Sequence, residues 1–387
     1  MKSNCGAAER ANDSAVSRRR FLAATVGAGV ALGSGQWLAA GGVANVPDPE
    51  TLVEKVADAV LRDFPEPPPF NWGEGTMLTG MMRAYELTKD ERYLGFVRTF
   101  ADHHHRLGIG ATLKERGYCG HWGPGYPMLM LYKATADKRY LELAEQICDF
   151  IMNKAERTAD AGLSHFNGKP QLWVDTLDMC CPVLSNLARV SSRPELQKEA
   201  VRQLLIFAKH LRDPKTGLFY HVWDEQTRVH TPSFWARGNG WVVMSHTEVL
   251  KNEKAGSPDA ASLMAPFKEQ LAGLVTLQDK DSGLWHTVLD QPDTYEEGSA
   301  SSMFLYGMAE CRNCKLFDVP YDQTMRKAWI GLARTILPDG RVGGVSAGTG
   351  PSDKSGYVSR DVGTYTWGTG AFLLAACAYA KKEPPRT

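Results

Sequence analysis

The chain has 387 residues, of which 43% are hydrophobic, so it is long enough to bury a large core in one domain or two. Its 44 basic and 44 acidic residues give a formal charge of zero at pH 7. This balanced charge does not favour nucleic acid or an anionic membrane as a partner. We expect instead a small ligand that is recognised locally.

The N-terminus has the pattern of an export signal. Residues 17–22, Ser-Arg-Arg-Arg-Phe-Leu, precede a weakly apolar run rich in glycine and alanine that extends to about residue 40. This order is typical of a twin-arginine signal. An uncleaved membrane anchor is the alternative, but the run is short and interrupted by glycine and polar residues. We expect residues 1–45 to be signal and linker, and residues 46–387 to form one periplasmic domain without a membrane attachment after cleavage.

Apolar and amphipathic helices alternate along the rest of the chain. Apolar patterns cover residues 76–87, 125–134, 175–190, 242–250, 303–310 and 371–380. Amphipathic patterns cover residues 52–61, 89–107, 137–154, 194–212, 258–278 and 321–336. An apolar helix must be surrounded by others, whereas a helix with a single apolar stripe can lie at the surface. Six of each predict an all-α fold, the (α/α)6 barrel, with the N-termini of the inner helices at one mouth.

Two internal repeats support this architecture. Residues 88–94 (TKDERYL) and 135–141 (TADKRYL) open two amphipathic helices with the same motif, as expected of a repeated helical pair. Residues 213–224 and 279–290 also align, with Gly217 on Gly283 and Leu218 on Leu284. This second repeat predicts the same turn and hairpin after two of the outer helices.

The stretch from Trp173 to Met179, WVDTLDM, provides the candidate catalytic residue, Asp175, between an indole and the start of an apolar helix. The alternative is that Asp175 and Asp178 only cap the first turn of that helix. Other loops at the mouth carry side chains that a sugar acid would need. The candidate substrate-binding residues are Trp173, Asp178, His165, His221, Trp235, Arg237, Asn239, Trp241, His121, Trp122 and Trp367.

The chemistry of these side chains suits a carbohydrate. Indole rings can stack on the apolar face of a sugar, although each can instead plug the end of the barrel. Arg237 offers a planar fork for a carboxylate, with a surface ion pair as the alternative. His221 lies where the other repeat copy has Thr287, so packing of the repeat does not require a histidine there. A structural histidine is the competing interpretation.

Five motifs spread in order over residues 50–380 carry a family resemblance: WVDTLDM, GLFYHVWD, WARGNGW, EEGSAS and TWGTGAF. They resemble the unsaturated rhamnogalacturonyl and glucuronyl hydrolases of glycoside hydrolase families 88 and 105. The resemblance implies the (α/α)6 fold and removal of a Δ4,5-unsaturated uronic acid from oligosaccharides made by polysaccharide lyases. It implies that Asp175 is the general acid and base, that His221 contacts the substrate near the reaction, and that Trp235, Arg237 and Trp241 bind it.

Two further expectations concern the charge of the site. Many relatives carry a second Asp before the second inner helix, where this chain reads YCGHWG at residues 118–123, and His121 is the candidate replacement. We expect burial and the like charge of Asp178 to raise the pKa of Asp175, so that Asp175 can donate a proton.

Other functions remain open on the sequence alone. An ordinary exo-glycosidase acting on a saturated uronide would use Glu297 as the partner of Asp175, and a lyase or a noncatalytic exported carbohydrate-binding protein are further alternatives. We expect no cofactor and no metal, because Cys311 and Cys314 form a lone CxxC without a second pair. The other cysteines of the mature chain have the pattern of small buried hydrophobes. The expected partner is an oligosaccharide with an unsaturated uronate, and the protein is a monomer or a homodimer.

Overall fold

The computed structural model describes residues 47–318 and 320–381. The expected export signal and linker, residues 1–45, lie outside the described residues. One compact unit contains residues 47–347 and 351–381. None of the described helices combines the length and the apolarity needed to cross a bilayer.

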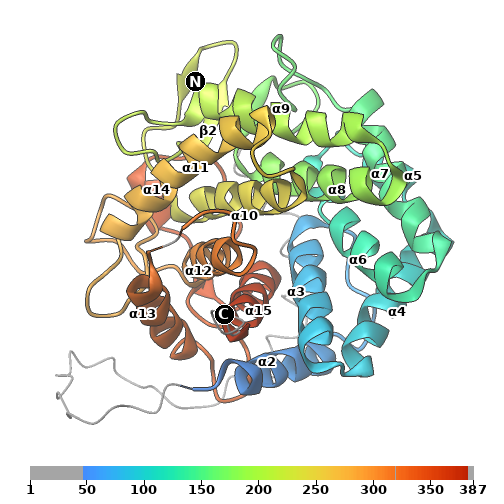
Figure 1. Ribbon diagram of the computed structural model, residues 1–387, viewed down its shortest axis with the longest axis horizontal. Coiled ribbons are helices and arrows are strands. Elements are labelled where there is room, and N and C mark those ends of the chain that lie inside the picture. Colours follow the sequence, from blue (N-terminus) through green and yellow to red (C-terminus); the bar gives the residue numbers. More distant parts are fainter. Residues whose placement is uncertain (1–46, 319, 382–387) are drawn as a thin grey trace. The chain divides into compact units, whose positions relative to one another are not determined.

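Six mostly buried helices form a closed ring within this unit. They are α3 (Trp72–Thr88), α6 (Gly125–Thr135), α8 (Asp175–Ser191), α10 (Ala236–Asn252), α12 (Gly298–Asn313) and α15 (Thr366–Ala380). Each contacts the next in this order, and α15 returns onto α3 (Figure 1). In α12 every residue from Gly298 to Cys311 is buried, which is why its sequence shows no polar face.

Six outer helices each cover one inner helix. They are α2 (Pro49–Asp63), α4 (Glu91–Leu107), α7 (Lys138–Asn153), α9 (Pro194–Leu211), α11 (Pro258–Thr276) and α13 (Asp322–Ala333). They pack respectively on α15, α3, α6, α8, α10 and α12. α4 buries a single stripe, formed by Tyr93, Leu94, Val97, Phe100 and Ala101. The predicted all-α (α/α)6 barrel is therefore confirmed.

The repeated motif at residues 88–94 and 135–141 caps two outer helices. The carboxylate of Asp90 accepts a hydrogen bond from the backbone N–H of Arg92 at 2.9 Å, and that of Asp137 accepts one from Arg139 at 3.0 Å. In each copy, the tyrosine that follows donates its hydroxyl to an aspartate of the preceding outer helix. The repeat therefore encodes the start of an outer helix and its contact with a neighbour.

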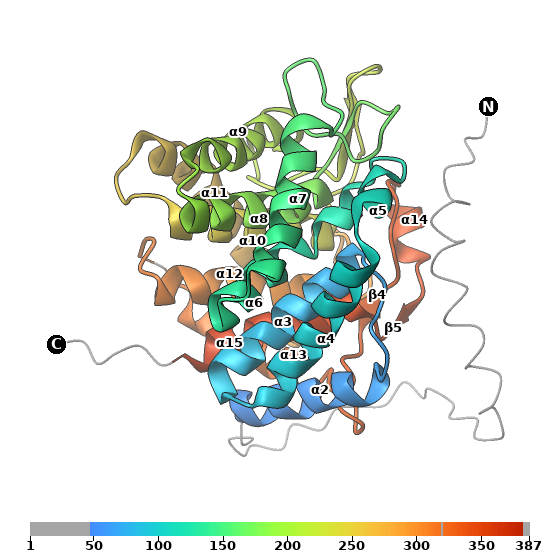
Figure 2. The same cartoon turned by 90° about the vertical axis from the view of Figure 1, so that its right-hand side faces the viewer.

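Short elements connect the helices on one side of the barrel. They are α5 (Gly110–Lys114), the 3-10 helix η1 (Cys119–Trp122), α14 (Lys354–Val358) and five strands: β1 (Gln171–Trp173), β2 (Val222–Asp224), β3 (Val229–His230), β4 (Val345–Ser346) and β5 (Val362–Gly363). The first three strands form an antiparallel sheet in the order β1-β2-β3, and β4 pairs with β5. Figure 2 shows α5, α14, β4 and β5 together at the right of the barrel.

The two aligned loops share their turn but not their hairpin. Gly217 and Gly283 both have a positive φ, +74° and +78°, which favours glycine at this point of the turn. In both copies a backbone hydrogen bond closes the turn. The N–H of Asp213 donates to the carbonyl of Leu218, and the N–H of Asp279 donates to the carbonyl of Leu284. The predicted hairpin is present in the first copy as β2 and β3. In the second copy the pairing is reduced to an antiparallel bridge between His286 and Glu296, without regular strands.

Candidate active site

Strand pairing outside the barrel brings the catalytic candidate and a histidine together. Asp175 is the first residue of α8 and follows β1, and Trp173 of β1 pairs with Val222 of β2. This register places His221 beside the start of α8, where its carbonyl accepts a hydrogen bond from the backbone N–H of Val174 at 3.0 Å. The Oδ2 atom of Asp175 lies 3.0 Å from Nε2 of His221. The structure therefore joins the two residues that the sequence nominated separately.

A tyrosine that the sequence did not suggest completes this arrangement. Tyr357 of α14 places its hydroxyl 3.0 Å from Nδ1 of His221, so both ring nitrogens of the fully buried histidine are occupied. The indole of Trp235 lies 4.3 Å from the His221 ring and stacks parallel to Tyr357. The side chain of Asp175 keeps 21% of its surface exposed. Asp175 can therefore contact a ligand, while Tyr357 and Trp235 hold the ring of His221 in place.

The pKa of Asp175 is lower than that of an ordinary aspartate. Burial is the largest single influence and would raise this pKa, but the charge and hydrogen bond of His221, followed by His165 and Arg237, lower it. The expected increase is therefore wrong. Its physical reason is that the nearest titratable neighbour of Asp175 is an imidazole from another loop, whereas Asp178 faces elsewhere.

His165 lies next to this pair and carries no charge. Its ring stacks on Trp173 with centroids 4.2 Å apart and planes 6° apart. Burial, opposed by Asp175 and reinforced by His221, lowers the pKa of His165 to about 3. The structure thus places His165 and Trp173 together at the start of α8, as expected, with His165 as a neutral hydrogen-bonding group.

Arg237 is buried and bonded within the protein. Its guanidinium donates to the carbonyl oxygens of Ser346 and Ala347 at 2.9 and 2.8 Å, and its Nη1 lies 3.5 Å from Glu297. Burial is the main reason that the pKa of Arg237 is lowered. Arg237 thus holds the segment around β4 against α10, and its predicted contact with a substrate carboxylate remains a prediction.

Two of the expected indoles lie beside Arg237, and Trp72 connects one of them to a third. The guanidinium carbon lies 4.7 Å from the ring centre of Trp235 and 5.5 Å from that of Trp367. Trp72, at the start of α3, stacks on Trp367 at 4.5 Å and meets Trp241 edge to face at 6.0 Å. Trp235, Trp241 and Trp367 are at most 5% exposed, so most of their ring surface is already in contact with protein, and their predicted stacking on a sugar remains a prediction.

Asn239 and Glu297 have structural partners. The amide of Asn239 donates to the carbonyl of Phe219 at 2.9 Å and accepts from its N–H at 2.8 Å, which fixes the first aligned loop on α10. Glu297 is fully buried, caps α12 by accepting from the N–H of Ala300 at 2.6 Å, and also accepts from Ser346 at 2.9 Å. With its oxygens engaged in this way, Glu297 is poorly placed to activate water for a classical two-carboxylate hydrolysis.

His121 and Trp122 lie further from the pair. His121 is buried beside Tyr118, with ring centres 5.3 Å apart, and burial is the main reason that its pKa is lowered. His121 is not among the groups that influence the pKa of Asp175 most strongly. Trp122 is fully buried and packs against Phe150 of α7. The loop that precedes α6 contacts the site through another residue, Cys119, whose thiol lies 3.0 Å from His165.

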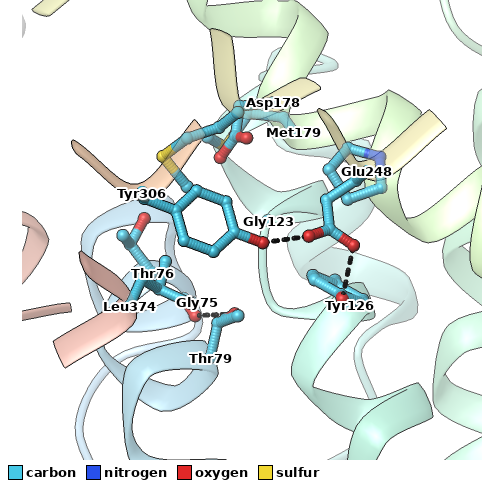
Figure 3. Close-up of a pocket in the computed structure, with 12 residues that line it drawn as sticks. Gly75, Thr76, Thr79, Gly123, Tyr126, Asp178, Met179, Glu248, Tyr306 and Leu374 are labelled. Atoms are coloured by element: carbon cyan, nitrogen blue, oxygen red, sulfur yellow. Dashed lines mark hydrogen bonds between the residues drawn. The ribbon is translucent and has the colours of Figure 1, made fainter. Parts of the chain in front are cut away.

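Asp178 faces a small cavity on the inside of the ring. The cavity has a volume of about 20 Å³, enough for one water molecule, and Figure 3 shows the carboxyl group of Asp178 directed into it. Across it lies Glu248, which accepts hydrogen bonds from Tyr126 at 2.7 Å, from Tyr306, and from Lys251 at 2.9 Å. Among the described residues Oδ1 of Asp178 has no hydrogen-bond partner. Burial, then Glu248 and Asp175, raise the pKa of Asp178 well above its usual value.

No group of three or more His, Cys, Asp or Glu side chains in the described part of the chain is arranged to hold a metal ion. Cys311 and Cys314 are both free, the first buried and the second exposed. The remaining described cysteines are also free and buried, as the sequence predicted.

Comparisons with known proteins agree with this fold. An unsaturated rhamnogalacturonyl hydrolase of Bacillus subtilis is 31% identical over 309 residues, which are 78% of this chain and 86% of the relative. An unsaturated 3S-rhamnoglycuronyl hydrolase of Formosa agariphila is 28% identical, over 81% of this chain and 85% of its own length. The crystal structure of a possible member of glycoside hydrolase family 105 from Salmonella enterica matches with a TM-score of 0.77 at 28% identity and covers 86% of this chain and 93% of that one.

The sequence model of Glycosyl Hydrolase Family 88 matches residues 49–382. The match begins at the first residue of α2 and extends past the last residue of α15, so that it includes all twelve barrel helices. Because both the whole ring and the site at its mouth lie inside this match, the chain belongs to Glycosyl Hydrolase Family 88.

Proposed function

We propose that the protein removes a Δ4,5-unsaturated uronic acid from the non-reducing end of oligosaccharides that polysaccharide lyases generate. The observation that carries this proposal is the pair formed by Asp175 and His221 at the mouth of the barrel, with Oδ2 and Nε2 3.0 Å apart. The names of the two relatives above support the substrate class. A single carboxylate with an imidazole partner suits hydration of an alkene better than it suits direct displacement at a glycosidic carbon.

The pair supplies both proton transfers. A proton held between Asp175 and His221 is given to C4 of the enol ether, and water adds to C5 while the same pair takes up one proton of that water. The resulting C5 hemiketal opens to a ketone, which leaves C1 as a hemiacetal. The hemiacetal then collapses to an aldehyde and releases the next sugar as an alcohol. One water is consumed, and the pair returns to its starting state.

Charge and aromatic surface around the pair fit the rest of the substrate. The positive charge of the buried Arg237 favours a carboxylate near Trp235 and Trp367. This attraction acts through the charge, since N–H groups of Arg237 already donate to the carbonyls of Ser346 and Ala347. The neutral ring of His165 can offer a hydrogen bond without repelling an anion. In this arrangement the acid group of the sugar lies on the side of Arg237, and the double bond lies at Asp175.

We also infer that the protein acts after export to the periplasm. The twin-arginine pattern at residues 17–22 supports this inference. Replacing Arg18, Arg19 and Arg20 by lysine should retain the protein in the cytoplasm. Cell fractionation followed by detection of the protein in the periplasmic extract checks this outcome.

The test of the enzymatic function is a panel of lyase-generated oligosaccharides from pectin, ulvan and glycosaminoglycans. We expect loss of the ultraviolet absorbance of the double bond together with release of the shortened oligosaccharide, and neither change with Asp175→Asn. Three outcomes would contradict the proposal. Cleavage of a saturated uronide would indicate an ordinary exo-glycosidase, new absorbance a lyase, and binding without product a carbohydrate-binding protein.

A further inference from the structure

Three buried side chains behind the catalytic pair form a hydrogen-bonded cluster. Sγ of Cys119 lies 3.0 Å from Nδ1 of His165, and Oγ1 of Thr176 lies 3.1 Å from the same nitrogen. The hydroxyl of Thr176 also donates to Sγ of Cys119 at 3.6 Å. All three side chains are buried, and Thr176 directly follows Asp175 in α8. The cluster therefore connects the loop before α6 to the first turn of the catalytic helix.

We propose that Cys119 and Thr176 are positioning residues that hold His165 in one neutral tautomer, with its hydrogen on Nε2. In this state His165 offers an N–H donor to an oxygen atom of the sugar acid beside Asp175. The proposal rests on the proposed function for the identity of that sugar. Its structural part, the fixed tautomer, stands independently of what the site binds.

The charge states of the cluster support this assignment. Burial is the main reason that the pKa of His165 falls to about 3, so the ring is neutral and carries one hydrogen. Burial likewise raises the pKa of Cys119 well above that of an ordinary cysteine, so the side chain is a thiol with one hydrogen to donate. Each member of the cluster then has one hydrogen.

Counting these hydrogens selects the tautomer. The Thr176 hydroxyl donates to Sγ of Cys119, and the thiol hydrogen finds its acceptor in Nδ1 of His165 at 3.0 Å. Nδ1 can accept only if it carries no hydrogen, which places the ring hydrogen on Nε2. With the ring hydrogen on Nδ1, the cluster would have three hydrogens and only two acceptor atoms, so one hydrogen would lack an acceptor there. Among the described residues no hydrogen bond reaches Nε2 of His165, so this nitrogen is left for a ligand.

The surroundings of the ring keep this donor in place. The stack of His165 on Trp173 opposes rotation that would exchange the two nitrogens. The carbonyl of His165 accepts a hydrogen bond from the N–H of Cys119 at 3.1 Å, which ties the two loops together. Both Asp175 and His221 are close enough to influence the pKa of His165. The free nitrogen is thus carried by a ring held beside the catalytic pair.

The direct test measures the tautomer by nuclear magnetic resonance. The full chain is labelled with ¹⁵N in histidine only, and His165 is assigned from the resonances lost in His165→Gln. We expect the hydrogen on Nε2 in the wild type between pH 5 and 8, the same spectrum in Cys119→Ser, and a mixed or reversed tautomer in the double variant Cys119→Ala/Thr176→Val, which removes both donors to Nδ1. A hydrogen on Nδ1 in the wild type, or an unchanged tautomer in the double variant, would overturn the proposal. If this double variant does not fold, Cys119→Val/Thr176→Val takes its place, because it also removes both donors and leaves a smaller cavity.

Kinetics on the oligosaccharide provide the second readout. The double variant Cys119→Ala/Thr176→Val should lower kcat/KM by roughly three- to tenfold, mainly through a higher KM, because one neutral hydrogen bond is no longer fixed. Cys119→Ser should stay within about twofold of the wild type, since a hydroxyl also donates to Nδ1. The matched control is Cys148→Ala, another buried thiol, which lies on α7 outside the cluster and should leave KM unchanged. A wild type that turns over no unsaturated uronide would contradict the proposed function, while the resonance spectrum would still decide the tautomer.

Discussion

Trp173 lies opposite Val222 in the β1–β2 pair, and this register determines the geometry of the site. His221 precedes Val222, and Asp175 follows Trp173 by two residues. A shift of the pairing by one residue would turn His221 to the opposite face of the strand and would separate it from Oδ2 of Asp175, now 3.0 Å away. The helical ring therefore supplies the scaffold, whereas a three-residue strand pair brings together the two residues that we propose to be the catalytic pair.

Asp175→Asn should abolish turnover without unfolding the protein. Asparagine keeps the shape of the side chain but can neither hold nor accept the transferred proton. General acid and base catalysis contributes about 10² to 10⁴ in rate, and one residue serves here in both steps, so we expect kcat to fall by at least about 10³. The measurement is the decrease in double-bond absorbance, accompanied by thermal unfolding and by titration with substrate. Near-normal turnover would show that another group carries the proton.

Tyr357→Phe should weaken catalysis through His221. The hydroxyl of Tyr357 occupies Nδ1 of His221 at 3.0 Å, and its loss leaves the orientation and tautomer of the buried imidazole less defined. A neutral hydrogen bond contributes about 0.5–1.5 kcal/mol, so kcat/KM should fall by roughly three- to tenfold, with a change in the pH profile. The control is Tyr93→Phe on α4, which removes a hydroxyl bonded to Asp58. An equal loss of activity in both variants would argue against a specific role for Tyr357.

The sequence predicted the ring of helices well because burial alone dictates its pattern. An inner helix such as α12 is enclosed on all sides, whereas an outer helix such as α4 is covered on one side only. The first therefore has apolar or small residues all around it, and the second has a single apolar stripe. The cap at Asp90 and its repeat at Asp137 are likewise local, since each acceptor lies within one turn of its donor.

The partners of the site residues were not predictable in the same way. Tyr357 comes from a segment without regular periodicity, and Arg237 bonds to backbone carbonyls of residues 346 and 347, which no side-chain pattern reveals. The direction of the Asp175 pKa was wrong for the same reason. The prediction considered Asp178 on the same helix, whereas the dominant partner, His221, arrives by strand pairing.

Arg237→Lys should destabilise the protein as well as affect binding. A lysine ammonium cannot reach both carbonyls that the planar guanidinium now serves, and Glu297 would lose part of its buried counter-charge. Leaving one of these buried carbonyl groups without its donor costs about 1–3 kcal/mol, which urea unfolding can measure. Arg341→Lys, at an exposed pair with Asp63, is the control and should change stability by less than about 1 kcal/mol. A large increase in KM with unchanged stability would instead identify Arg237 purely as a substrate anchor.

Asp178→Asn should stabilise the protein at neutral and alkaline pH. Burial, Glu248 and Asp175 raise the pKa of Asp178 in the folded state, whereas in the unfolded chain it titrates near 3.9. The stability that protonated Asp178 contributes is fully present below about pH 3.9 and is lost as the pH rises through the folded pKa. Over that interval the wild type loses up to about 1.4 kcal/mol per pH unit relative to the neutral asparagine. Urea unfolding at pH 4, 6 and 8 should therefore show a growing advantage for Asp178→Asn.

Glu248→Gln provides the matched control. It removes the carboxylate on the other side of the same cavity, whose pKa is shifted in the opposite direction from that of Asp178. Burial would raise the pKa of Glu248, but Lys251, Arg83 and the two tyrosine hydroxyls lower it to about 2. The stability from ionised Glu248 is present above its unfolded pKa of about 4.3 and is lost as the pH falls toward about 2. Glu248→Gln should therefore be less stable than the wild type at pH 6 and 8, with the deficit shrinking in acid. Parallel pH curves for the two variants would contradict the assignment of a neutral Asp178 facing an ionised Glu248.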